Sequence, residues 1–217
     1  RLTDTFDTGS AKIKLNGGLL AIDSDTTLNS SIENLATSTI EIAETKNLIY
    51  EGATLNIGAS ELSIVGGGTF SNTNPLQLNN VSSKLILSGI SASYVRTDSD
   101  SLGVVIDSSS SVGNINNQFH VGHVTPVSIS ANQSLDGVVD IYSNGNLKLN
   151  NSGTLSATVT VKGNAYGSGT AGGKIEVKET MTFSGTLQQT PDHNGLEISI
   201  DPEKTMTYTG SGFNIGS

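Results

Sequence analysis

Short apolar pairs, each split by one residue, recur along this chain at nearly constant spacing. One series runs Leu20/Ile22, Ile40/Ile42, Leu62/Ile64, Leu85/Leu87, Val104/Ile106, Val127/Ile129, Leu147/Leu149, Ile175/Val177 and Ile198/Ile200. The steps between its members are 20, 22, 23, 19, 23, 20, 28 and 23 residues. Each pair places two apolar side chains on one face of a short strand. No strand this short buries that face alone, so the spacing predicts a coil that stacks on copies of itself.

A second series of pairs lies between the members of the first. It comprises Ile13/Leu15, Leu55/Ile57, Leu76/Leu78, Val139/Ile141 and Val159/Val161. Two or three strands in each repeat of about 22 residues describe a parallel β-helix. We therefore expect an all-β fold, a single-stranded parallel β-helix (solenoid) of about ten coils, with residues 1–217 forming one domain.

Two glycine-rich stretches and one ambiguous segment refine this expectation. The Gly66-Gly-Gly68 run follows the Leu62/Ile64 strand and is predicted to form its corner. The 28-residue step contains a Gly-rich insertion at 164–173, which is predicted to loop out between two coils. Residues 30–47 carry a capping-box signal for a short helix, but their alternating, β-branched Thr-Ser-Thr-Ile-Glu-Ile run favours a strand.

Composition limits the function classes open to such a coil. Apolar residues make up 35% of the chain and aromatic residues 5%, which is lean for one central core and suits a thin solenoid interior. With 11 Lys and Arg against 20 Asp and Glu, the net charge of −9 argues against nucleic-acid and anionic-membrane partners. The chain lacks cysteine, so disulfide and thiol chemistry are excluded, and we expect no cofactor and no metal.

Two further features concern the parent protein. No apolar run is long enough to span a membrane, so no membrane insertion is expected. The chain begins at Arg1 without an initiator methionine, and we expect it to be a fragment of a longer chain.

Residues 80–90, 102–119 and 137–147 share one sequence pattern. These stretches repeat a strand of the Gly-Val-Val-Ile type followed by Gly-Ile or Asn corners. The pattern resembles the right-handed parallel β-helix, pectate-lyase-like superfamily, as seen in phage tailspike and tail-fibre segments and in autotransporter passenger domains. The resemblance implies the fold. It assigns no residue role, because no active-site motif is matched and such folds serve as lyases, hydrolases, adhesins and stalks.

Carboxylates and histidines supply the candidate chemistry. If the chain degrades polysaccharide, its acids would come from Asp98, Asp100, Asp107 or Asp140, since neighbouring coils can bring distant carboxylates together. The alternative is that these residues lie in solvated loops, and no catalytic residue is assigned. His120 and His123 lack an evident third metal ligand, so a non-catalytic surface or corner role is predicted.

A few large polar side chains are expected on outward faces or in loops, where carbohydrate binding uses aromatic rings and Arg–Asp pairs. They are Tyr94, Arg96, Tyr142, Tyr166 and His193. We expect an extracellular structural or recognition module, foremost a phage tail-fibre or tailspike segment that binds host surface glycan. Such a module would sit on a virion tail or cell surface, with a homotrimer as a possible assembly. The alternatives are an autotransporter-like bacterial surface adhesin and a polysaccharide-degrading glycosidase or lyase.

Overall fold

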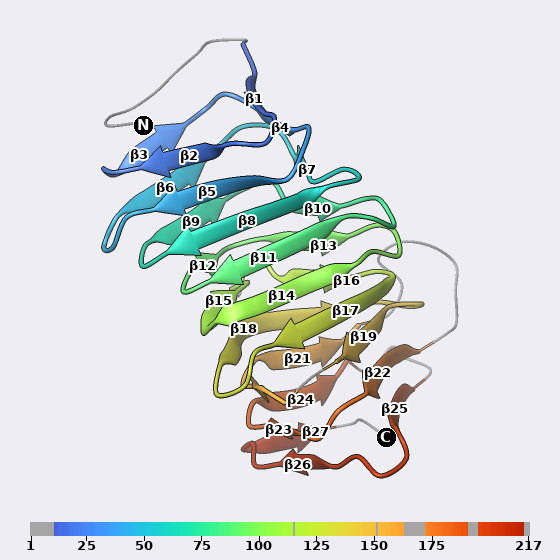
Figure 1. Cartoon of the computed structure of the whole chain (residues 1–217). Coiled ribbons are helices and arrows are strands. Elements are labelled where there is room, and N and C mark those ends of the chain that lie inside the picture. The colour runs from blue at the N-terminus through green and yellow to red at the C-terminus, as the bar shows by residue number, and fades with distance from the viewer. Residues whose placement is uncertain (1–10, 115, 151, 163–171, 191–194, 215–217) are drawn as a thin grey trace.

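The computed structural model describes residues 11–114, 116–150, 152–162, 172–190 and 195–214. Throughout these residues the chain forms strands and turns without any helix, in coils stacked from β1–β3 at one end to β25–β27 at the other (Figure 1). Every strand pairing among the described residues is parallel, and each coil visits three faces in the same order. The fold is therefore a parallel β-solenoid, as the repeat predicted.

The three faces are defined by their strands. The first face contains β2 (Leu19–Ile22), β5 (Ser38–Ile42), β8 (Glu61–Gly66), β11 (Lys84–Ser88), β14 (Gly103–Ser108), β17 (Val124–Ile129), β19 (Asn146–Leu149), β22 (Gly173–Val177) and β25 (Leu196–Ile200). The second face contains β3 (Thr26–Leu28), β6 (Asn47–Tyr50), β9 (Thr69–Asn72), β12 (Ser91–Ala92), β15 (Ser110–Val112), the start of β18 (Ser134–Ile141), β20 (Thr154–Leu155), β23 (Met181–Phe183) and β26 (Met206–Tyr208). The third face contains β1 (Ile13–Leu15), β4 (Ile32–Asn34), β7 (Leu55–Asn56), β10 (Leu76–Leu78), β13 (Val95–Thr97), β16 (Phe119–Val121), the end of β18, β21 (Thr158–Val161), β24 (Thr186–Gln189) and β27 (Gly212–Asn214).

The number of coils is slightly lower than expected. The first face has nine strands in the described residues, one in each coil, which gives about eight full turns in place of about ten. The segment that carried mixed signals forms two strands, β4 and β5, so the strand prediction holds there. The Gly-rich insertion at 164–173 lies almost wholly outside the described residues.

The first series of apolar pairs lies on the first face, and six of its eight predicted steps match the observed pairing. Two steps are wrong by two residues. Ile40 pairs with Ile64 where Leu62 was expected, and Val127 pairs with Leu149 where Leu147 was expected. A shift of two residues keeps the same side chains inward, so the apolar pattern alone cannot detect it.

The interior is filled by the inward side chains of all three faces. Leu, Ile and Val dominate, and the second face adds the fully buried rings of Tyr50, Phe70 and Phe183. Each fully buried large apolar side chain contributes about 1.5–3 kcal/mol relative to exposure. The second series of pairs proves to be the third face, where Leu55 pairs with Leu76 and Val139 with Val159.

Corners depend on residues that can leave the strand sharply. Gly66 is the last residue of β8 and has a φ of +125°, as predicted for the corner that leads to β9. A Cβ atom at this position would lie 1.9 Å from the carbonyl oxygen of Ile42 on the preceding coil. Because that oxygen belongs to the backbone of a paired strand, it cannot move away cheaply, and glycine is required.

We therefore expect Gly66→Ala to lower stability by at least about 2 kcal/mol, through the clash and the strained φ. Gly18→Ala is the matched control, since a Cβ atom there meets nothing within 4 Å. Urea unfolding followed by circular dichroism measures both variants. Equal midpoints for the two variants would contradict the account of this corner.

No helix within the described residues has the length and apolar character needed to cross a bilayer.

Candidate functional site

The outer side of the third face carries a column of polar residues, one from each successive coil. Pairing places them in the order Gln77, Arg96, His120, Asp140, Thr160 and Gln188. Neighbours in such a column lie about 4.8 Å apart. Residues separated by some twenty positions in sequence therefore become direct neighbours, and Arg96, His120 and Asp140 meet at the centre of the face.

Three rings form a row across this column. Tyr94 and Tyr142 each contact His120 edge-on, with ring centroids 5.0 Å apart in both pairs. The Tyr94 hydroxyl lies 3.4 Å from Nδ1 of His120, and the Tyr142 hydroxyl lies 3.3 Å from Nε2. The Gln118 Oε1 atom lies 3.2 Å from Nε2 and can only accept, so we assign the proton to Nε2 and let Tyr94 donate to Nδ1.

The surroundings of His120 keep its imidazole neutral. Burial is the largest cause that lowers the His120 pKa, and the Lys162 and Arg96 charges lower it further against the opposing effect of Asp98. The pKa falls to about 4, so the ring is uncharged at neutral pH. A neutral imidazole in this position offers one donor and one acceptor to its neighbours.

Two ion pairs flank the rings. Arg96 Nε lies 2.5 Å from Asp98 Oδ1, and Gln77 donates from Nε2 to Asp98 Oδ2. Lys162 Nζ lies 2.6 Å from Asp140 Oδ2, although the Asp140 side chain is only 1% exposed on this outer face. Burial raises the pKa of Asp140, while Lys162 and the Thr160 hydroxyl limit the rise.

Local structure positions the outward groups. In β13, Val95 and Thr97 point inward, so the alternating residues Tyr94, Arg96 and Asp98 point outward. The main chain of Tyr94 is held by Asn72 of the preceding coil, whose side chain donates to the Tyr94 carbonyl at 2.7 Å and accepts from its amide at 3.1 Å. Both partners belong to the rigid ladder, so the ring is placed by the scaffold.

A shallow hollow adjoins the rings. It measures about 290 Å³ and is lined by Arg96, Thr97, Asp98, Gly122 and His123. Pairing puts Gly122 between Asp98 and Tyr142 in their shared column, and a Cβ atom there would lie 2.8 Å from the Thr97 carbonyl oxygen. We name the rings, the two ion pairs and this hollow the third-face patch.

The patch gathers many of the residues expected from the sequence. Tyr94, Arg96, Asp98, Asp140 and Tyr142 all belong to it, but Tyr142, expected on an outward face, is only 7% exposed and has His120 packed edge-on against its ring. Asp100 lies at its edge, highly exposed, with its Oδ1 accepting from the Val124 amide at 3.1 Å and lying 3.9 Å from His123 Nδ1.

Other expected residues do not join the patch. Asp107 is exposed at the end of β14 on the first face, and Tyr166 and His193 lie outside the described residues.

Sequence reasoning gave His120 only a surface or corner role and did not name Gln77, Gln118 or Lys162. A signal for His120 was present. It lies between Phe119 and Val121, which are both buried, so it must face outward from a strand. The missing information was the register, which alone shows that His120 is the neighbour of Arg96 and Asp140.

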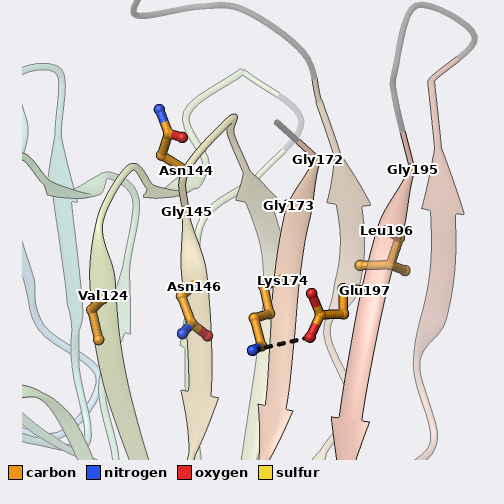
Figure 2. Close-up of a pocket in the computed structure, with 10 residues that line it drawn as sticks. All are labelled: Val124, Asn144, Gly145, Asn146, Gly172, Gly173, Lys174, Gly195, Leu196 and Glu197. Atoms are coloured by element: carbon orange, nitrogen blue, oxygen red, sulfur yellow. Dashed lines mark ion pairs between the residues drawn. The ribbon is translucent and has the colours of Figure 1, made fainter. Parts of the chain in front are cut away.

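A larger hollow of about 530 Å³ lies where the third face turns into the first face of the later coils (Figure 2). Asn146, Lys174 and Glu197 lie in line on neighbouring strands there. Lys174 contacts Glu197 at 3.0 Å and Glu176 at 2.9 Å, and its hydrogen bond is the main cause that lowers the Glu176 pKa to about 2.

The lining of this larger hollow is glycine-rich, because Gly145, Gly172, Gly173 and Gly195 leave it without bulky side chains. Among the described residues no aromatic ring lines it, and Lys174 pairs with Glu176 and Glu197, so the third-face patch is the better candidate.

The described residues contain no group of three or more His, Asp or Glu side chains arranged to hold a metal ion. Compared with protein-family models, curated proteins and solved structures, the chain matches none of them. The candidate site therefore rests on geometry alone.

The buried ion pair predicts an asymmetry between its two partners. Lys162→Met leaves the Asp140 carboxylate buried without a cation and should cost about 3 kcal/mol at neutral pH. Asp140→Asn leaves a partly exposed ammonium that water can solvate, and should cost about 1 kcal/mol. Urea unfolding at neutral pH compares the two variants. A larger loss in Asp140→Asn would show that the pair is not organised in this way.

His120 predicts a pH dependence. Between pH values of about 6.5 and about 4 the unfolded chain binds a proton that the folded chain refuses, so stability falls as the pH drops through this window. His120→Gln should remove about 1–2 kcal/mol of that acid-side loss, whereas His123→Gln, at an exposed position, should follow the wild type. Unfolding midpoints at neutral and acidic pH provide the measurement, and parallel curves for all three proteins would refute the assignment.

Proposed function

We propose that this chain is an extracellular carbohydrate-recognition module, in the form of a phage tail-fibre or tailspike segment that binds host surface glycan through the third-face patch. The observation that carries the proposal is the row of Tyr94, His120 and Tyr142 on an outer face beside a hollow. The parallel solenoid and its resemblance to the pectate-lyase-like superfamily support the extended, surface-exposed form.

The chemistry of the patch suits sugars. A sugar ring has an apolar C–H face that packs on an aromatic side chain, and a rim of hydroxyls that both donate and accept hydrogen bonds. Tyr94 supplies the ring, with the Gln118 acceptor oxygen near it against His120, while Asp98 carries its acceptor oxygens in the lining of the hollow. Each of these residues lies directly beside a paired strand, β13 or β16, which limits the ordering cost of binding.

The position of the carboxylates supports binding in preference to hydrolysis. Pairing places Asp98 two strands and two residues away from Asp140. At the usual strand spacing and rise this separates their α-carbons by about 12 Å, so the two side chains would have to lean toward each other to reach the roughly 5–9.5 Å between the carboxyl groups of glycosidases. Each carboxylate also has a cation against it. A polysaccharide-degrading glycosidase or lyase is thus the less supported class.

An autotransporter-like bacterial surface adhesin would use the same patch and differ only in the protein that carries it. A homotrimer would be the assembly of the tailspike form. Light scattering on the isolated chain addresses the assembly, and a stable monomer would count against an obligate trimer.

The recognition proposal is tested by screening the chain on an array of printed bacterial and host glycans, followed by calorimetry on the glycans that bind. Tyr94→Ala should weaken binding at least about ten-fold, through loss of the stacking ring. Lys148→Ala, on the outward side of first-face strand β19, should leave affinity unchanged.

Incubation with a bound polysaccharide should release no oligosaccharide. Released products would move the chain to the enzyme class. Absence of any bound glycan, or equal affinity of Tyr94→Ala and the wild type, would overturn the proposed site.

A further inference from the structure

The third-face patch contains several charged side chains, yet each cation in it is already compensated. Arg96 has the Asp98 carboxylate 2.5 Å from its Nε atom, and Lys162 has Asp140 at 2.6 Å. Both contacts are charge-assisted hydrogen bonds, so the carboxylates are partners that an anionic ligand would have to displace. Sites that bind anionic groups instead direct uncompensated arginine or lysine side chains at the ligand.

The remaining titratable groups add no positive charge. His120 is neutral, with Gln118 and both tyrosine hydroxyls around its ring nitrogens. His123 is about half exposed and lies 3.9 Å from Asp100, which is 63% exposed. In a formal count that takes histidine as neutral, the two cations Arg96 and Lys162 stand against the three carboxylates Asp98, Asp100 and Asp140, so the patch carries a formal charge of minus one.

The net charge of the whole chain adds to the negative potential at the patch. The whole sequence carries a formal net charge of −9, which repels polyanions before they reach the surface. A ligand for the patch must therefore bind through ring stacking and hydroxyl hydrogen bonds without help from long-range attraction.

We infer that the third-face patch selects neutral sugars, and that it discriminates against glycans whose contact residue is a uronic or sialic acid. This inference rests on the proposed function of the patch and names the class of its ligand. A carboxylated sugar would face the outward Asp98 and Asp100 carboxylates and would find no cation without a partner already in contact. A neutral sugar is not repelled by these carboxylates and needs no cation. Its hydroxyls can donate hydrogen bonds to the same carboxylates.

The experiment measures the affinity of the full chain for matched oligosaccharides. Each oligosaccharide is present in a neutral form and in a form capped with a uronic or sialic acid. The wild type should bind the neutral member at least about ten-fold more tightly than its acidic partner. Affinity for the neutral member should change less than about two-fold between low salt and about 0.5 M salt, since no ion pair forms with the ligand.

A charge variant supplies the positive test. Asp98→Asn removes the carboxylate charge next to Arg96 and should raise affinity for the acidic members by about ten-fold. Glu61→Gln is the matched control, because Glu61 forms the same kind of pair with Lys84 at 2.8 Å on the first face, and it should change nothing. Thermal unfolding of both variants confirms that they are folded before binding is measured.

The outcomes separate the inference from the function on which it rests. Tighter binding of acidic members by the wild type, or an Asp98→Asn variant that gains nothing for them, would overturn the selection for neutral sugars and leave glycan recognition standing. Failure of both members of every matched set to bind would remove the proposed function itself.

Discussion

Parallel hydrogen bonding between successive coils is the constraint on which every other feature depends. Most strands pair with their counterparts one coil before and one coil after, so a residue of one coil lies about 4.8 Å from its equivalents. The pairing stacks inward Leu, Ile and Val into a continuous interior. It also dictates which outward residues can touch, and in this way a chain with sparse functional residues assembles a patch from four coils.

The same pairing explains which parts of the structure the sequence could predict. The apolar sequence pattern predicted two of the three faces, because the inward positions of these faces are mostly Leu, Ile and Val. The second face was not predicted, because its inward positions include Asn72, Ala92 and Ser110 alongside aromatic rings. Asn72 is tolerated inside because its amide donates to the Asn74 and Tyr94 carbonyls, and no apolar pattern announces such a site.

The candidate site was predictable as a set of residue types and not as an arrangement. Tyr94, Arg96 and Tyr142 stood out as large side chains at outward positions. Their convergence on His120 could not be predicted, because it depends on steps of 24 and 20 residues from Arg96 to His120 and from His120 to Asp140. Coil lengths in this chain vary, so the sequence alone does not fix these steps. A two-residue slip like the one at Ile40 would have left the inward pattern intact and dispersed the patch.

A solenoid surface is convex and open, so a site on it must be made by side chains that cover one another. The outward column of the second face contains Thr69, Ser91 and Ser111, which are too small to exclude water from a neighbour. On the third face large side chains occupy consecutive coils, and among them a carboxylate on the outside of the coil, Asp140, loses nearly all contact with solvent. That local desolvation keeps His120 neutral and holds the ion pairs closed. The size of the outward side chains therefore distinguishes the third-face patch from the outward column of the second face.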